Sequence, residues 1–414
     1  MNETSISLSR RHLLAASALA LPAAGCASLN AGAPAAAAKP AAAPAPAAAA
    51  GAKSLPAYAA WKDADSLIIH SSNTLETRRS AFGSSVITPT AQLFVRNNVS
   101  PPDAAIVADP QAWVVSVEGV RQPRQLSVRE LQGMGIETLA MVLQCSGNGR
   151  AFFPHKPSGT QWTVGAAGCV IWSGVPVRAV VDALGGVAEG MRFMTGTGGE
   201  TLPAGIDPKS ILVERSLPLT AMADAMLVWE LNGAPIPLAH GGPLRLVVPG
   251  YTGVNNVKYL KRLAFTAAES DARIMASRYR MAPLGAKGDT SQPSVQEMSV
   301  KSWINSPHPD AAGLRSGTLQ VHGVAMGGLH TVARVEVSID GGATWGEARF
   351  IGPDIGKYAW RQFVLPVRLA PGRHVLASRA TDAAGKVQPR ERPENSGGYN
   401  NNGWADHAVT VTVA

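Results

Sequence analysis

The last third of the chain carries the pattern that most restricts its fold, namely short apolar runs that alternate with polar residues. These runs are GTLQVHGVAM, ARVEVSIDGGATW, WRQFVLPVRL, HVLASRATD and HAVTVTVA, and turn residues separate them. Alternation with a period of two predicts strands that each bury one face. The pair Asp340-Gly341 between two runs predicts a hairpin. We therefore predict that residues 288–414 form an all-β, immunoglobulin-like sandwich, and we find no helical pattern there.

Residues 55–287 mix strand and helix patterns. AWVVSVEGV, VLQC and PLRLVVPG predict strands, whereas LSVRELQGM and VPVRAVVDALGG predict helices. Ser127 followed by Glu130 has the spacing of a capping box, which marks a helix start. Two glycines end the second helical pattern. Because the strands and helices do not alternate strictly, we predict an α+β domain.

Residues 1–30 have the pattern of an export signal. In LSRRHLLAASALALPAAGC, paired arginines precede a short apolar run and small residues. The run is too short to span a bilayer. Arg10 and Arg11 indicate the twin-arginine route, and the alternative is an ordinary secretory signal with an incidental arginine pair. We therefore predict a periplasmic protein.

The next segment, residues 31–54, consists mostly of Ala, Pro and Gly. Its spaced prolines break helices, so an extended tether is expected. Cys26 lies just before this tether and is a candidate site of lipid attachment. The sequence leaves lipidation open, so a membrane anchor is expected only if Cys26 is modified.

Charge and cysteine content exclude several classes of function. The net charge is +8, but no segment concentrates it with interleaved aromatic residues, so nucleic-acid binding is not expected. The chain has no CxxCH motif for covalent haem and no CxxC pair for zinc. Besides Cys26, only Cys145 and Cys169 are present, and a disulfide between them remains an alternative to two free thiols.

Four segments concentrate residues that bind anions or a soft metal. They are LFVRNN with Arg96, CSGNGR with Cys145 and Arg150, the run from His240 to Leu263 with Arg245, Lys258 and Lys261, and SRYRM with Tyr279. A thiolate is a soft ligand, and nearby arginines lower the pKa of a thiol and bind anions. A metal that is carried by a cofactor needs only one protein thiolate. The alternative is that Cys145 is a buried core cysteine.

Taken together, these segments resemble the sulfite oxidase family of molybdenum enzymes over residues 85–414. CSGNGR resembles the family's Cys-(Ala/Ser)-Gly-Asn-x-Arg loop, and TQWTVGAAGCVIWSGVPV resembles the segment after it. HGGPLRLVVPG with NNVK resembles the molybdopterin-binding run, and SRYRM resembles the segment of the catalytic tyrosine. The export signal and the lack of haem motifs make the chain most similar to the molybdenum subunit of bacterial periplasmic sulfite dehydrogenases.

The resemblance implies a sulfite-oxidase-type molybdopterin domain over residues 55–287 and a dimerisation domain over residues 288–414. It implies a molybdenum–molybdopterin oxidoreductase, without haem in this chain, that oxidises sulfite to sulfate. An external cytochrome c or another acceptor would take the electrons, and the chain would form a homodimer. The implied catalytic residues are Cys145 as metal ligand, Arg96 and Arg150 as clamps on the substrate oxygens, Tyr279 and Trp162. The implied cofactor-binding residues are Phe94, Val95, Arg96, Asn97, Asn98, Cys145, His240, Arg245, Asn256, Val257 and Lys258.

Two positions depart from the family pattern. Asn98 stands where the family commonly has histidine, so a titrating group is lost there. Asn401 lies near the position where the family usually supplies a substrate-binding arginine, so the pocket is expected to be less positive. A neutral oxo-acceptor such as a sulfoxide, reduced on the same scaffold, is therefore an alternative, and a non-catalytic binding protein is a third. Cys169 and three histidines of the β-rich part are interpreted as structural, namely His308, His330 and His374.

Overall fold

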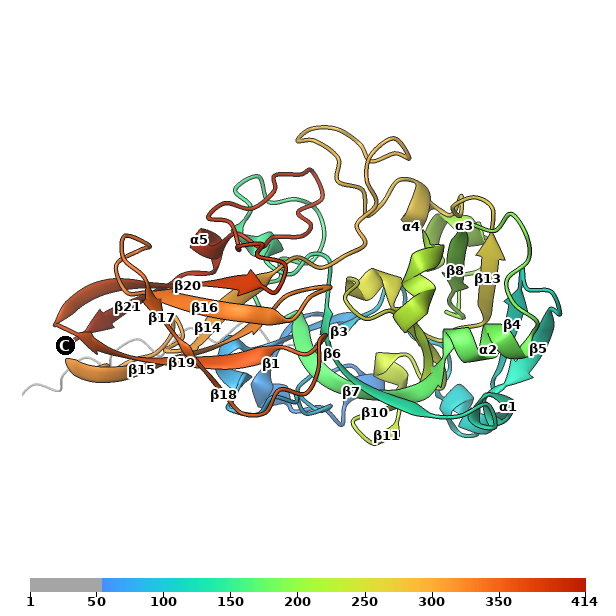
Figure 1. Cartoon of the computed structure of the whole chain (residues 1–414), viewed down its shortest axis with the longest axis horizontal. Coiled ribbons are helices and arrows are strands. Elements are labelled where there is room, and N and C mark those ends of the chain that lie inside the picture. The colour runs from blue at the N-terminus through green and yellow to red at the C-terminus, as the bar shows by residue number, and fades with distance from the viewer. Residues whose placement is uncertain (1–53) are drawn as a thin grey trace, which may run out of the picture. The chain divides into compact units, whose positions relative to one another are not determined.

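Five β-sheets and a few short helices build residues 54–414, which are the part of the chain that this computed structural model describes (Figure 1). The predicted export signal, Cys26 and residues 31–53 of the predicted linker lie outside the described residues and stay predictions. The predicted domain boundary at residue 288 also stays a prediction. No helix in residues 54–414 is both long and apolar enough to cross a membrane.

Three sheets precede residue 270. The first has the order β1-β2-β3, the second β11-β10-β7-β6 with β12 also paired to β10, and the third β5-β4-β13-β8-β9. Only the β13–β4 pair of the third sheet is parallel. The strands are β1 Leu67–Ser71, β2 Thr74–Thr77, β3 Val95–Arg96, β4 Val114–Glu118, β5 Arg124–Ser127, β6 Glu137–Gln144, β7 Ala167–Pro176, β8 Phe193–Thr197, β9 Glu214–Pro218, β10 Met226–Leu231, β11 Ala234–Pro235, β12 Arg245–Val247 and β13 Arg262–Thr266.

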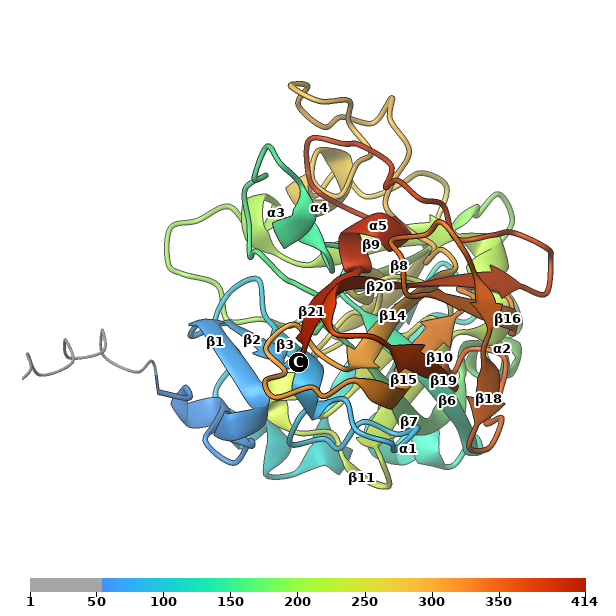
Figure 2. The same ribbon diagram turned by 90° about the vertical axis from the view of Figure 1, so that its left-hand side faces the viewer.

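Two further sheets form the β-sandwich, and Figures 1 and 2 show their strands lying together. Their orders are β14-β15-β19-β18 and β17-β16-β20-β21. The strands are β14 Lys301–Ser306, β15 Gly317–Met326, β16 Val332–Ser338, β17 Gly346–Glu347, β18 Arg349–Ile351, β19 Arg361–Leu369, β20 Gly372–Asp382 and β21 Val409–Val413. Buried residues from both sheets share one apolar core, including Val321 and Phe363 from one sheet and Leu376 and Val409 from the other. The predicted sandwich is therefore confirmed.

The helices are short. They are α1 Val128–Gln132, α2 Val177–Ala183, α3 Pro208–Ile211, α4 Arg273–Ala276 and α5 Trp404–His407. Short 3-10 turns are η1 Ala57–Ala59, η2 Ala64–Ser66, η3 Arg79–Ala81, η4 Ala104–Val107, η5 Pro110–Ala112, η6 Arg150–Phe152, η7 Leu219–Asp224, η8 Leu238–His240 and η9 Gly253–Asn255. The predicted capping box is present, because Ser127 and the Glu130 side chain each accept from the other's backbone N–H. Few helices beside many strands confirm the α+β prediction for the first domain.

Two details of the β-rich part differ from the sequence prediction. The expectation of no helix there was wrong, since α5 is a single helical turn just before β21. One turn is too short to show the 3.6-residue periodicity by which helices are found in a sequence. The predicted hairpin joins β16 to β17 through a longer loop, in which the carboxylate of Asp340 accepts from the backbone N–H groups of Ala343 and Thr344, each at 2.9 Å.

Candidate active site

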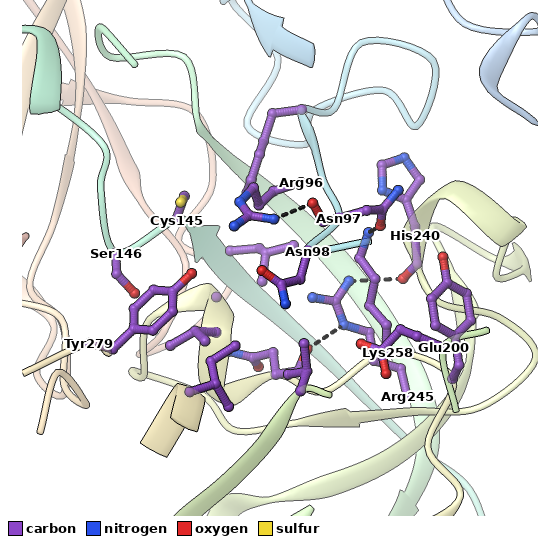
Figure 3. Close-up of a pocket in the computed structure, with 18 residues that line it drawn as sticks. Arg96, Asn97, Asn98, Cys145, Ser146, Glu200, His240, Arg245, Lys258 and Tyr279 are labelled. Carbon is purple, nitrogen blue, oxygen red and sulfur yellow. Dashed lines mark hydrogen bonds between the residues drawn. The ribbon is translucent and has the colours of Figure 1, made fainter. Parts of the chain in front are cut away.

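One cavity collects most of the residues that the sequence singled out (Figure 3). It holds about 730 Å³ of space, including its open mouth. The predicted residues in its wall are Phe94, Arg96, Asn97, Asn98, Cys145, His240, Arg245, Asn256, Lys258 and Tyr279. These come from segments that span almost 190 positions of the chain, so the fold alone brings them together.

Cys145 lies at the point where β6 ends and a tight loop begins. Its backbone N–H donates to the oxygen of Ala166 and its carbonyl accepts from the N–H of Asn148, both at 2.9 Å. Both cysteines in the described part are free thiols, so the alternative of a Cys145–Cys169 disulfide is not realised. In Figure 3 the Cys145 sulfur, the guanidinium of Arg96 and the hydroxyl of Tyr279 point toward the same space. This end of the cavity therefore combines a soft ligand, a cation and a phenol.

Tyr279 is held by unusual backbone geometry and by a second tyrosine. Its φ of 53° is a left-handed conformation that is uncommon for a bulky residue. Its ring stacks on that of Tyr399, with ring centres 5.1 Å apart and an interplanar angle of 24°. The guanidinium of Arg215 lies 5.7 Å from the centre of the Tyr279 ring. The sequence did not predict Tyr399, because its role depends on the return of the C-terminal segment to the cavity.

The opposite end of the cavity is cationic. Arg245 is 2% exposed and donates to the backbone oxygens of Asn256, at 3.1 Å, and His240, at 2.9 Å. Lys258 donates to the Asn97 side-chain oxygen at 2.7 Å and to a backbone oxygen at 2.6 Å. Burial and the nearby guanidinium of Arg245 hold the pKa of Lys258 well below 10.5. Such a site stabilises an anion, because an anion would relieve the repulsion among these cations.

His240 is neutral in this setting. Burial and the neighbouring Lys62 and Lys258 hold the pKa of His240 well below 6.5. The Lys62 ammonium lies 3.1 Å from the His240 Nε2 atom and also donates to the backbone oxygen of Thr90 at 2.7 Å. Burial lowers the pKa of Lys62 to about 7. The sequence did not predict Lys62, which precedes the matched segments and shows no motif of its own.

The same wall holds one carboxylate, Glu200, which the sequence also did not predict. Its Oε2 atom is buried and has no hydrogen-bond partner among residues 54–414. Burial raises the pKa of Glu200 to about 7. A buried acceptor without a donor is costly, so Glu200 can accept an N–H group of a molecule that fills the cavity.

Arg150 lies outside the cavity wall, although the sequence predicted it as a substrate clamp. Its side chain is buried, and it donates to the backbone oxygens of Gly397, at 3.0 Å, and Thr160, at 3.2 Å. Its guanidinium lies 5.2 Å from the centre of the Tyr399 ring. A Cβ atom at Gly147 would come within 2.5 Å of this guanidinium, so the glycine leaves room for it. Arg150 thus joins the cysteine loop to the C-terminal segment.

Three other predicted residues also stand behind the wall. Trp162 is fully buried and packs edge-on against Phe94, with ring centres 6.4 Å apart, so it supports a wall residue. Val95 and Val257 are buried in apolar cores. In strand β3, Val95 faces away from its neighbour Arg96 because side chains alternate along a strand.

The two asparagines that depart from the family pattern have different places. Asn98 lines the cavity and donates to the backbone oxygen of Ile211 at 2.6 Å. Asn401 is 1% exposed and lies behind the cysteine loop, where it donates to the backbone oxygen of Gly149 at 3.0 Å. It also donates to the carboxylate of Asp406 at 2.8 Å. Among the described residues, Arg96 is therefore the one arginine at the cysteine end of the cavity wall.

Two protein families match the chain in sequence order. The oxidoreductase molybdopterin binding domain matches residues 102–274, and the Mo-co oxidoreductase dimerisation domain matches residues 292–413. The chain is 32% identical to the sulfite oxidase of Gallus gallus over 318 residues, which are 73% of this chain and 68% of that protein. It is 31% identical to the mitochondrial sulfite oxidase of Homo sapiens over 350 residues, which are 79% of this chain but 62% of that protein.

A solved structure agrees with these matches. The sulfane dehydrogenase SoxCD from Paracoccus pantotrophus superposes with a TM-score of 0.69 at 26% identity, covering 82% of this chain and 86% of that one. This chain belongs to the sulfite oxidase family. The predicted family, fold class and molybdopterin cofactor are thereby confirmed, and the protein is a molybdenum-dependent oxidoreductase. Its β-sandwich corresponds to the family's dimerisation domain.

The side chains in the cavity fit the cofactor of the sulfite oxidase family. Cys145 would hold the metal through its sulfur, and Arg245 and Lys258 would hold a phosphate group of the cofactor. Glu200 supplies the buried acceptor that lacks a donor. Among residues 54–414, no three His, Cys, Asp or Glu side chains are grouped to hold a metal ion by themselves. The donor set therefore suits a metal that arrives on an anionic, N–H-bearing cofactor.

We expect Arg150→Gln to act mainly on stability. The substitution removes a buried, charged donor from two backbone oxygens, and each such hydrogen bond is worth about 1.5–3 kcal/mol. The free energy of unfolding, measured by urea titration, should fall by roughly 2–4 kcal/mol. Arg178→Gln is the matched control, because Arg178 is exposed and paired with Glu137, and it should cost less than about 1 kcal/mol. A raised KM with unchanged stability would instead restore the predicted role as a substrate clamp.

Proposed function

We propose that this protein is an exported molybdenum enzyme that oxidises sulfite to sulfate and passes the electrons to an external cytochrome c. The observation that carries the proposal is the convergence of Cys145, Arg96 and Tyr279 at one end of a cavity whose other end is cationic. When bound, molybdenum–molybdopterin supplies the redox change and the oxygen-atom transfer. The protein supplies binding, orientation and charge.

Arg96 is the group that binds the substrate in this proposal. A guanidinium can hold two oxygens of an oxyanion at once, and such charge-assisted hydrogen bonds are about twice as strong as neutral ones. Arg96 already donates to the backbone oxygen of Asn97, which limits the directions in which its remaining N–H groups can point. It thereby places the substrate beside the Cys145 sulfur.

Tyr279 is the second group at this end of the cavity. Its phenol can donate one hydrogen bond to a substrate oxygen. The stack with Tyr399 and the neighbouring Arg215 fix the ring, so little conformational entropy is lost when the hydrogen bond forms. Asn98 adds an amide to the cavity wall. This amide can form hydrogen bonds but does not titrate.

Export and dimerisation are further parts of the proposal. Paired Arg10 and Arg11 before a short apolar run support export to the periplasm by the twin-arginine route. The match to the dimerisation domain supports a homodimer.

A sulfane is a second candidate substrate. SoxCD is named a sulfane dehydrogenase, and the match covers 82% of this chain and 86% of that one. Arg150 and Asn401 donate to backbone oxygens and do not line the cavity. Among the described residues, Arg96 is then the one arginine at the cysteine end of the cavity wall. A single cation suits a substrate with less negative charge than sulfite, because each further charge would need its own partner.

One experiment separates the candidates. The exported protein is purified, its molybdenum content is measured, and reduction of cytochrome c is followed with sulfite and with a sulfane-sulfur compound as alternative donors. We expect close to one molybdenum per chain and sulfite-dependent reduction. Molybdenum near zero would refute the enzyme proposal, and turnover with the sulfane compound alone would select the second candidate.

A further inference from the structure

A second cavity lies on the outer face of the β14-β15-β19-β18 sheet, and we refer to it as the sheet cavity. It holds about 980 Å³ of space, including its open mouth. It shares no wall residue with the cavity of the candidate active site, which we call the cofactor cavity. The loop from Ser80 to Ser84 forms one side, and a row of sheet residues forms the other. The redox site makes no use of this cavity.

The register of the strands places this row on one face. Ser306 pairs with His322, His322 pairs with Val364, and Val364 pairs with Arg349. Directly paired residues point to the same side of a sheet. A register shift between Ile304 and Ser306 lets Asn305 line the cavity beside its neighbour Ser306.

The polar side chains of the sheet cavity have unused hydrogen-bonding groups. Asn305 is 2% exposed, and both its amide nitrogen and its amide oxygen are buried without a partner. The Nε2 atom of His322 is also buried without a partner. Within residues 54–414, neither Arg349 nor His308 has a side-chain hydrogen bond or ion pair. Arg349 is exposed, whereas the unpaired atoms of Asn305 and His322 are buried. An unpaired buried polar group costs about 1–3 kcal/mol, so a ligand that pairs Asn305 and His322 recovers that energy.

The charge of the wall indicates the class of ligand. Among the described residues, the wall contains Arg349, two histidines and an asparagine but no carboxylate. Burial lowers the pKa of His322, so Arg349 supplies the positive charge and His322 offers a ring N–H as a donor. Arg349 and His322 lie on either side of Val364, so their backbones are about 10 Å apart at the usual strand spacing. An extended arginine side chain is shorter than that distance. A small ion can therefore lie above Val364, between the guanidinium of Arg349 and the ring of His322.

We propose that the sheet cavity binds a small tetrahedral oxyanion, phosphate or sulfate, held by Arg349, His322 and the amide of Asn305. The site shares no wall residue with the candidate active site, and it lies between the Ser80–Ser84 segment and a sheet of the dimerisation domain. His308, which the sequence indicated to be structural, also lines this cavity. The proposal does not depend on the substrate of the molybdenum site.

The test is calorimetric titration of the holoenzyme with phosphate and, separately, with sulfate at constant ionic strength. We expect Arg349→Gln to weaken oxyanion binding by about tenfold or more, which is the effect of losing one charge-assisted hydrogen bond. Arg368→Gln is the matched control, because Arg368 is an exposed arginine of the same sheet outside the cavity, and it should bind as the wild type does. Neither variant should change turnover, whichever substrate the enzyme uses.

A second variant guards against a folding defect. Asn305→Asp adds a negative charge, and it should abolish binding of the oxyanion in the sheet cavity, leaving any binding at Arg96 of the active site, while circular dichroism reports the fold. Soaked selenate, located by anomalous scattering, should appear beside Arg349 in wild-type crystals. Equal binding by the wild type and Arg349→Gln would overturn the proposal. So would a wild-type dimer that binds no oxyanion here because an acidic side chain of the second copy fills the cavity.

Discussion

Cys145→Ser is expected to abolish turnover while the protein remains folded. A serine hydroxyl stays protonated and is a hard ligand, so it cannot replace a thiolate on a soft metal. Turnover should fall by more than the roughly 10–100-fold that is typical when a residue hydrogen-bonded to a metal ligand is replaced. Turnover with cytochrome c, the molybdenum content and the visible absorption from sulfur-to-metal charge transfer measure the effect.

Cys169→Ala is the matched control for this prediction. Cys169 is fully buried in an apolar cluster, and burial raises the pKa of its thiol to about 12, so it stays protonated. The substitution should lower the free energy of unfolding by about 0.5–3 kcal/mol and leave turnover intact. Unchanged turnover and absorption in Cys145→Ser would show that this sulfur is not a ligand.

Lys258→Met is expected to lower the cofactor content of the purified protein by about tenfold or more. Methionine keeps the length of the side chain but removes a charge-assisted hydrogen bond to the cofactor, which is worth about 1.5–3 kcal/mol. The amount of released pterin, measured by fluorescence, reports the loss. Gly241, whose φ is 97°, allows the Lys258 side chain to pass, because a Cβ atom there would lie 2.6 Å from it.

The same lysine should make cofactor binding depend on pH. In the cofactor-free chain, the pKa of Lys258 lies well below 10.5, and a bound phosphate would raise it. Binding therefore takes up a proton, and affinity should fall as pH rises through the lowered pKa. Lys261→Met is the control, since the Lys261 ammonium lies 3.4 Å from the centre of the Trp113 ring and outside the cavity. Full cofactor content and an unchanged pH dependence in Lys258→Met would contradict the assignment.

Elements with a local signal were predicted well. The capping box of Ser127 and Glu130, the alternating runs of the sandwich and the turn at Asp340 all depend on residues a few positions apart. The segment motifs likewise found most of the wall of the cofactor cavity. The helix α5 was missed because its four residues make a single turn, which is too short to repeat a periodic pattern.

Side chains that act across the fold were not predicted correctly or at all. Arg150 follows the cysteine by five positions, yet its direction is set by carbonyls of Thr160 and Gly397. Glu200 reaches the cofactor cavity from a loop without a motif. The unpaired groups of the sheet cavity come from separate strands, and only their register brings them together.

By itself, the sequence determined the family, the sheet-rich architecture and the motif that carries Cys145, because periodicity and short motifs are properties of neighbouring residues. The tertiary structure alone decided which cations face the cofactor, which carboxylate lacks a donor and which arginine turns away. The direction and the pKa of a side chain depend on the groups packed around it, and those groups come from distant parts of the chain.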